Sequence, residues 1–183
     1  IKRTPLSSYQ QQKSGGKGIA GASQSNSDII KDMVNTSNHQ NLILFTNQGR
    51  MLMLKVYQIP EGSRKARGTY ISNLLSLHEG EYIATAIGHK DLNTDRYCMF
   101  ITKQGMVKKS EIRLYKNLRS SGLNAVSLKK GDELISVKEV DNNKEMILVT
   151  TKGMEIRFSC REVRSTGRVA IGVKGISLNS DDQ

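Results

Sequence analysis

One pattern occurs three times in this chain, and it constrains the fold more than any other feature. In each copy a run of apolar residues leads to Thr-Xaa-Xaa-Gly, and a second, alternating run follows. The glycines of the three copies, Gly49, Gly105 and Gly153, lie 56 and 48 residues apart. A second shared phrase follows the first two copies, as LSLHEGEYI from Leu75 and as VSLKKGDELI from Val126. A period of about 50 residues indicates one supersecondary unit that is used repeatedly.

The repeated unit is predicted to consist of β-strands. Its apolar runs are short, and each closes on a glycine turn of the kind in which positive φ is favoured. The nearest approach to a helical pattern is the short segment 27–34. All-β units of about 40 to 50 residues, each with about four strands, are typical of propeller blades. We therefore expect an all-β propeller of four-stranded blades, with the three glycine turns at equivalent places.

The chain length predicts a partial domain. A closed propeller has about four to eight blades, and this chain holds only about three and a half repeats. Its start, IKRTPL, matches VKKSEI at 107–112, in the middle of a repeat, and GISL at 175–178 begins a second phrase that stops. We expect one partial β-propeller over residues 1–183, an open arc with exposed strand edges. Its approximate repeats are 1–40, 41–97, 98–145 and 146–183.

The charge of the chain predicts its class of partner. Lys and Arg exceed Asp and Glu by 11, and the isoelectric point is near 9.7, as is typical of proteins that bind nucleic acid or another anionic surface. The sign of the charge also follows the repeat: residues 98–130 hold eight cations and one acid, and residues 131–145 hold two cations and five acids. We expect a basic rim with the acids elsewhere. A membrane surface is less favoured, because no amphipathic helix or apolar segment of about 18 residues is present.

No residue pattern points to catalysis or to a metal. Cys98 and Cys160 are expected to be free thiols, and His39, His78 and His89 to be ordinary surface or turn residues. No P-loop, nucleophile elbow or metal-binding helix motif occurs. Aromatic residues are few, so contacts with phosphates are favoured over base stacking.

The segment QQKSGGKG at 11–18 differs from the rest of the chain. Its glycines beside Lys13 and Lys17 predict a mobile loop whose backbone can approach a phosphate closely. Segments in the same phase of the other repeats are GSRKARG at 62–68, NLRSSG at 117–122 and RVAIGVKG at 168–175. This correspondence favours an elaborated connection between blades over a linker between domains.

These phrases together resemble the C-terminal domain of the A subunit of bacterial DNA gyrase, over nearly the whole chain. Residues 1–19 resemble its first blade, and KVYQIPEGSRKARG, NLRSSGLNAVSLKKGDELI and GMEIRFSCREVRSTGRVAIGVKGISL resemble the following ones. The family's gyrase box, usually QRRGGRG, corresponds to residues 12–18, with Lys13 and Ser14 in place of two arginines. The box-like loop comprises Gln12, Lys13, Ser14, Gly15, Gly16, Lys17 and Gly18.

The resemblance implies a six-bladed disc, the β-pinwheel, in which strands are exchanged between neighbouring blades. It implies that duplex DNA wraps around the basic perimeter, so that DNA gyrase introduces negative supercoils in an ATP-dependent manner. The family's cleaving tyrosine and ATP site lie in other domains, so no catalytic residue, metal or cofactor is expected here, with ATP and Mg used elsewhere in the holoenzyme. The implied partners are duplex DNA, the N-terminal breakage-reunion domain of the same polypeptide, and the gyrase B subunit in an A2B2 heterotetramer. The implied location is the bacterial cytoplasm, at the nucleoid.

The cations expected to contact DNA lie in the repeated strand-like segments and in the loops between blades. Three alternatives remain open: the corresponding domain of topoisomerase IV, a protein-interaction propeller and a propeller enzyme. The predicted DNA-binding residues are Lys2, Arg3, Lys13, Lys17, Arg64, Lys65, Arg67, Lys108, Lys109, Arg113, Arg119, Arg157, Arg164, Arg168 and Lys174.

Overall fold

The structure, a computed structural model, describes residues 1–23, 29–119 and 121–183. These residues form short antiparallel strands and a few single-turn 3-10 helices. The strands are β1 (Asn41–Thr46), β2 (Arg50–Lys55), β3 (Ile83–His89), β4 (Tyr97–Thr102), β5 (Met106–Glu111), β6 (Leu123–Asn124), β7 (Leu134–Val140), β8 (Glu145–Val149), β9 (Glu155–Ser159) and β10 (Val173–Lys174). The 3-10 helices are η1 (Leu6–Ser8), η2 (Val56–Gln58), η3 (Ile71–Asn73) and η4 (Ile112–Tyr115).

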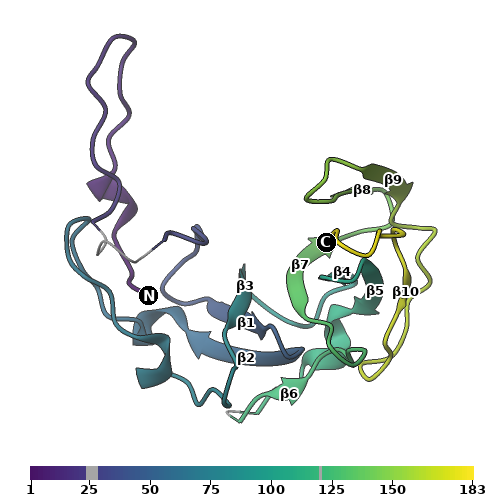
Figure 1. Ribbon diagram of the computed structural model, residues 1–183. Coiled ribbons are helices and arrows are strands. Elements are labelled where there is room, and N and C mark those ends of the chain that lie inside the picture. The colour runs from purple at the N-terminus through teal and green to yellow at the C-terminus, as the bar shows by residue number, and fades with distance from the viewer. Residues whose placement is uncertain (24–28, 120) are drawn as a thin grey trace.

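The strands form two four-stranded sheets and a hairpin. The first sheet has the order β3-β1-β2-β6, the second has the order β10-β5-β4-β7, and β8 pairs with β9 in the last hairpin. The sheets follow one another along an arc, and β6 and β10 lie on its outer side (Figure 1). The prediction of an all-β fold of four-stranded units is confirmed.

The Thr-Xaa-Xaa-Gly turns have the same geometry in all three copies. Gly49, Gly105 and Gly153 have φ of 82°, 76° and 80°, a region that L side chains rarely adopt. Each glycine N–H donates to the carbonyl oxygen of the threonine at 3.0 Å, and each threonine Oγ1 accepts from the N–H of the residue after the glycine at 3.2 Å. The threonine and the glycine are therefore both required by the turn, which confirms the expected equivalence.

Each four-stranded sheet includes one strand from the following unit. Leu123 of β6 pairs with Met51 of β2, and Val173 of β10 pairs with Val107 of β5. The chain start follows the same rule, because Ile1 and Thr69 exchange two backbone hydrogen bonds of 2.7 Å. This arrangement confirms the strand exchange that the family resemblance implied.

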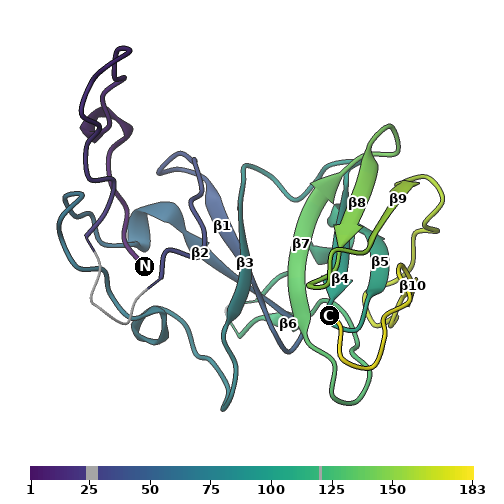
Figure 2. The same cartoon turned by 45° about the horizontal axis from the view of Figure 1, so that its top comes forward.

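The main core lies between the two sheets. Phe45 of β1 meets Phe100 of β4 edge to face, with ring centroids 5.6 Å apart, and the Tyr115 ring lies 6.1 Å from that of Phe100. Strands β3 and β7 are the neighbouring edges of the two sheets (Figure 2), and the Val137 N–H donates to Thr85 Oγ1 across them at 3.3 Å. The sheets thus stack side by side, as blades of a propeller do.

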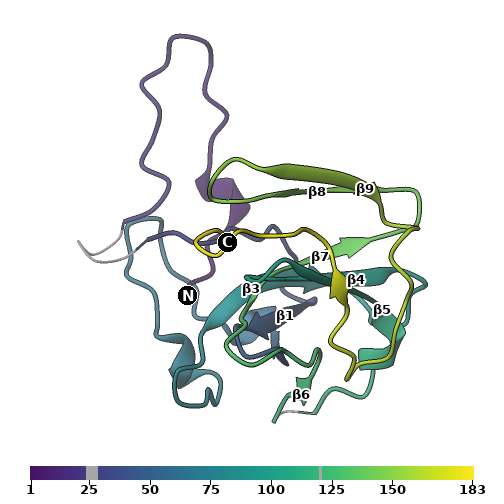
Figure 3. The same ribbon diagram turned by 45° about the vertical axis from the view of Figure 1, so that its right-hand side comes forward.

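The last hairpin leaves apolar side chains in solvent. Ile147 and Val149 are 58% and 66% exposed, whereas Ile43 and Met99, at the place of Ile147 in the two sheets, are 3% and 0% exposed. Figure 3 shows the hairpin standing apart from the strands of the second sheet. In the described part of the chain no sheet covers this face.

Three smaller expectations can be compared with the structure. The segment 27–34 lies partly outside the described residues, and its described part, 29–34, is not helical. Cys98 and Cys160 are buried free thiols, as predicted. His89 is not an ordinary surface residue, because its Nε2 lies 3.3 Å from the Glu139 carboxylate of the neighbouring sheet.

No helix among the described residues is long and apolar enough to cross a membrane.

Candidate nucleic-acid interface

The candidate interface is built on three connectors, which join the end of one hairpin to the strand that is added to the preceding unit. They are residues 60–68, residues 117–122 without 120, and residues 164–172. The first leads to Thr69 beside Ile1, the second to β6 and the third to β10. Because β6 and β10 lie on the outer side of the arc (Figure 1), the second and third connectors are brought to that side as well.

A glycine ends each connector where the backbone passes over the preceding strand. A Cβ at Gly68 would lie 2.7 Å from the Ile1 carbonyl oxygen, and a Cβ at Gly122 would lie 2.8 Å from that of Met51. At Gly172, where φ is 97°, the Cβ would lie 2.3 Å from the carbonyl oxygen of Val107. The close approach leaves no room for a side chain, so each connector lies directly against the backbone of the preceding unit, at Ile1, at Met51 of β2 or at Val107 of β5.

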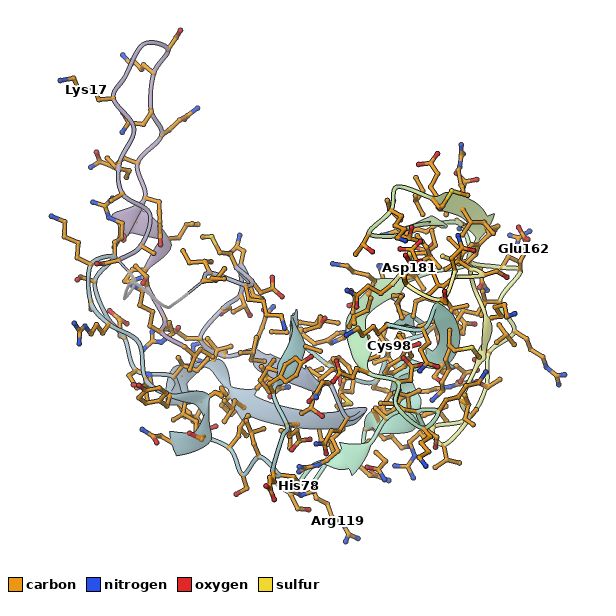
Figure 4. The ribbon with its side chains drawn as sticks, viewed as in Figure 1. Lys17, His78, Cys98, Arg119, Glu162 and Asp181 are labelled. Carbon is orange, nitrogen blue, oxygen red and sulfur yellow. The ribbon has the colours of Figure 1, made fainter. Side chains whose placement is uncertain are left out.

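Ten of the fifteen predicted DNA-binding cations are exposed, and seven of these lie on the connectors or on the box-like loop. Figure 4 shows Arg119 on the outer side of the arc, with its side chain directed away from the ribbon. Within the described residues the following make no salt bridge: Lys13, Lys17, Lys65, Arg67, Arg119, Arg164, Arg168 and Lys174. These eight cations are therefore free to meet phosphates.

The box-like loop extends away from the sheets. Residues 10–20 are all exposed, and Lys17 lies near the tip of the loop (Figure 4). Gly15 has φ of 81°, and the Gly16 N–H donates to the Lys13 carbonyl oxygen at 3.0 Å, which makes the tip a tight turn. At the base of the loop, the Arg64 guanidinium donates to the Ala20 carbonyl oxygen at 3.0 Å. The loop therefore presents its lysines well outside the core.

Lys108 and Lys109 are corrections to the expected set. They are only 1% and 4% exposed, and their ammonium groups bind inside the protein. Lys108 Nζ donates to the carbonyl oxygens of Ala125 at 2.7 Å and Arg168 at 2.5 Å, and Lys109 Nζ donates to that of Cys160 at 2.7 Å. Burial lowers the pKa of Lys108 to about 8 and also lowers that of Lys109. Neither side chain can reach a phosphate from this position.

Lys2 and Arg3 occupy the matching position at the chain start and are half-buried. Lys2 Nζ donates to the Arg64 carbonyl oxygen at 2.6 Å, and Arg3 forms a salt bridge of 2.7 Å with Glu61. Both charges therefore have partners within the protein, and their contact with DNA stays a prediction.

Arg113 and Arg157 are exposed but are paired with acids on the same hairpin. Arg113 pairs with Glu111, which raises its pKa, and Arg157 pairs with Glu145. Exposed pairs of this kind contribute little to stability, so either arginine can exchange its acid for a phosphate at little cost.

Part of the periodicity of charge along the chain has a structural cause that the sequence analysis did not predict. Asp132 and Asp182 accept from the N–H groups of Gln104 and Lys152 in the Thr-Xaa-Xaa-Gly turns, at 2.9 Å and 3.2 Å. Asp132 and Asp182 thus recur at matching places because each holds a turn. The buried Arg50, also missed, is described below.

The described residues contain no group of three or more His, Cys, Asp or Glu side chains that could hold a metal ion. Burial raises the pKa of the Cys98 thiol to about 12, so this sulfur is a poor nucleophile or metal ligand at neutral pH. The arrangement offers exposed cations on rigidly placed loops, which is the chemistry of an anion-binding surface.

The model of a family described as DNA gyrase C-terminal domain, beta-propeller, matches residues 1–37, 40–88, 96–141 and 144–183. The chain is 50% identical over 182 residues to the DNA gyrase A subunit of Lawsonia intracellularis, covering 100% of the chain and 22% of the relative. It is 43% identical over 177 residues to the DNA gyrase A subunit of Halalkalibacterium halodurans, covering 97% of the chain and 21% of the relative. The chain thus spans about a fifth of the length of these relatives.

Two solved structures share the fold over 99% of the chain. The C-terminal domain of a DNA topoisomerase IV matches with a TM-score of 0.78 and 35% identity, over 55% of that chain. A DNA gyrase A C-terminal domain matches with a TM-score of 0.77 and 28% identity, over 58% of that chain.

Proposed function

Because the chain belongs to the DNA gyrase C-terminal domain family, we propose that it binds duplex DNA along the outer side of the arc and bends the DNA around it. The observation that carries the proposal is the set of exposed, unpaired cations on successive connectors, with Arg119 directed outward in Figure 4. Connectors with the same place in each unit present charge at intervals along a curved surface, as a curved duplex requires.

Phosphate contacts are the contacts that such a surface can make. The connectors offer cations and backbone but few aromatic rings, so binding depends little on base sequence. Bending a site of 20 to 30 base pairs by 40° to 90° costs about 1 to 6 kcal/mol. Several phosphate contacts, each weak alone, offset that cost by releasing counterions.

We place this binding within DNA gyrase, an ATP-hydrolysing type IIA topoisomerase. The wrap around the arc sets the sign of the crossover, so the holoenzyme introduces negative supercoils. The partners are the breakage-reunion domain of the same polypeptide and the gyrase B subunit in an A2B2 heterotetramer, in the bacterial cytoplasm. ATP and Mg act elsewhere in the holoenzyme, and this chain supplies no catalytic residue.

A salt titration tests the binding surface. In a variant with Arg119, Arg164 and Arg168 changed to Gln, we expect the slope of log K against log salt to fall by about 0.9 for each phosphate that is no longer bound. Affinity should fall equally for two duplexes of unrelated sequence. A matched control changes Lys90, Lys138 and Lys144, which lie off the connectors, to Gln. An equal loss of affinity in the control would show that net charge alone governs binding.

The box-like loop needs a different assay. In the holoenzyme, changing Lys13 and Lys17 to Ala should impair negative supercoiling much more than relaxation, because relaxation needs strand passage but no wrap. Equal loss of both activities would assign the loop a general role in folding or catalysis.

The similarity to a topoisomerase IV domain supports a second candidate function within that enzyme. Two observations favour gyrase: the two gyrase A subunits compared above are 50% and 43% identical to the chain, above the 35% of the topoisomerase IV domain, and the box-like loop is present at 12–18. A holoenzyme that decatenates DNA but does not supercoil it would reverse this choice.

A further inference from the structure

Every connector is held by a cation of the preceding unit that donates to its backbone carbonyls. Lys2 Nζ binds the carbonyl oxygens of Arg64 at 2.6 Å and Ala66 at 2.8 Å in the first connector. Arg50 Nη2 binds that of Ser121 at 2.9 Å in the second. Lys108 Nζ binds that of Arg168 at 2.5 Å in the third.

The first and third of these contacts are the same contact in two units. In the first, the backbones of Arg3 and Glu61 form an isolated parallel β-bridge, and Thr4 Oγ1 donates to the Gly62 carbonyl oxygen at 3.1 Å. In the third, the corresponding bridge joins Lys109 to Ser165, and Ser110 Oγ donates to the Thr166 carbonyl oxygen at 2.8 Å. Counting two residues on from Gly62 and Thr166 leads to Arg64 and Arg168, whose carbonyl oxygens accept from Lys2 and Lys108.

The second connector is held from a different position. Leu52 stands where the third contact has Lys108, and it has no polar group to offer. Arg50, two residues earlier and on the same face of β2, reaches Ser121 instead, while its Nη1 pairs with the buried Glu81 at 2.6 Å. The connector is thus held by a lysine ammonium in the first and third cases and by an arginine guanidinium in the second.

A cation is suited to this place because, within the described residues, each connector pairs with the preceding unit through no more than one isolated β-bridge. The carbonyl oxygens of Arg64, Ser121 and Arg168 take part in partly buried contacts, where a donor from the protein replaces water. An ammonium has three donors and can serve two carbonyls at once, as Lys108 does with Ala125 and Arg168. The buried cation therefore fixes the path of the connector that carries the exposed cations.

We propose that Lys2, Arg50 and Lys108 are positioning residues of the DNA-binding surface. Each holds one connector against the preceding unit and so sets where its exposed arginines and lysines meet the phosphates. This inference rests on the proposed function, and it gives the buried Arg50 and Lys108 and the half-buried Lys2 a role without any contact with DNA.

The test compares Lys108→Met with Lys109→Met in the full chain, bound to a fluorescently labelled duplex. Both changes remove a buried ammonium from adjacent residues, but only Lys108 holds the third connector. We expect Lys108→Met to lower the slope of log K against log salt by about 0.9 for each phosphate that is no longer bound, and Lys109→Met to leave the slope unchanged. Equal slopes for the two variants would overturn the proposal.

A double-mutant cycle separates positioning from a general loss of stability. If Lys108 acts through Arg164 and Arg168, then Lys108→Met should have little further effect on affinity once both arginines are changed to Gln. Effects that multiply would show that the lysine supports the fold in general, and the proposal would then be wrong.

If Lys108→Met does not fold, Lys2→Met tests the same proposal on the first connector. Lys2 is near the chain start and only half-buried, so we expect this variant to fold. Hydrogen exchange should then accelerate at the amides of 62–68 in the free chain, with the amides of 117–122 unchanged, and the salt slope should fall. Unchanged exchange, or faster exchange with an unchanged slope, would refute the inference. If the DNA affinity of the unmodified chain does not depend on salt concentration, the proposed function is refuted instead.

Discussion

Changing Gly105 to Ala should destabilise the chain far more than changing Gly153 to Ala, although the two glycines occupy the same turn. Their φ values, 76° and 80°, are nearly equal, so both changes incur the cost of a left-handed alanine, about 1 to 2 kcal/mol. The neighbours differ. A Cβ at Gly105 would lie 2.7 Å from the Ile176 carbonyl oxygen, whereas a Cβ at Gly153 would meet nothing within 4 Å.

The extra cost follows from what must move. The carbonyl oxygen of Gly105 accepts from the N–H groups of Gly175 and Ile176 at 2.8 Å and 3.2 Å. Displacing the backbone at Ile176 weakens both bonds, each worth about 1 kcal/mol net. We therefore expect about 3 to 4 kcal/mol for Gly105→Ala and about 1 to 2 kcal/mol for Gly153→Ala.

Native-state hydrogen exchange is the appropriate assay, because repeat units can open separately and one global transition would average them. The free energy of opening should be read at the β4 and β5 amides for Gly105→Ala and at the β8 and β9 amides for Gly153→Ala. Protection at Ile176 should fall in the first variant alone. Equal losses of opening free energy would show that φ governs both turns and that packing against Ile176 contributes nothing.

Three further predictions concern buried polar groups. Thr102→Val should cost about 1 to 2 kcal/mol in urea unfolding, because it leaves the Met106 N–H without its acceptor, while Thr102→Ser should cost much less. Arg50→Met should cost about 3 kcal/mol because it leaves the buried Glu81 without its cation, and adding Glu81→Met should restore part of that loss; a double variant worse than the sum of the two singles would contradict the pairing. The folded chain holds the pKa of Lys108 near 8, below the ordinary 10.5, so the unfolded chain binds this proton more tightly and the free energy of unfolding should rise from pH 8 to pH 10.5. Lys109, whose pKa burial also lowers, and Cys98, whose pKa burial raises, titrate in both chains. The rise should therefore be smaller in Lys108→Met than in the unmodified chain, and an equal rise in that variant would rule out a contribution from Lys108.

The turns and strands could be predicted because their causes are local. Thr102 and Gly105 lie three residues apart, and the turn that needs them is closed by bonds within that segment. The alternation of apolar residues and the period of the repeat then indicated equivalent units before any contact was known. The strand exchange followed from a family resemblance, because β6 and β10 are two residues long and carry no pattern of their own.

The fate of the charges could not be predicted in the same way. Lys108 and Lys109 are adjacent in β5, so they face opposite sides of the sheet, and an ordinary strand would expose one of them. Both are buried because the third connector covers one side and the Cys160 backbone approaches the other. A signal was present in one copy: Leu52, which is 1% exposed, stands at the place of Lys108, whereas Lys2 and the exposed Ile156 occupy that place in the other copies.

The sequence by itself determined the repeated all-β unit, its glycine turns and its net positive charge, since each depends on residues close together in the chain or on composition alone. Only the tertiary structure decided which cations are free. A lysine in a strand is exposed or buried according to what packs over it, and here that is a connector far away in the chain, as the span of 60 residues between Lys108 and Arg168 shows. The same long-range packing places the exposed cations on the outer side of the arc, where charge can act on a partner.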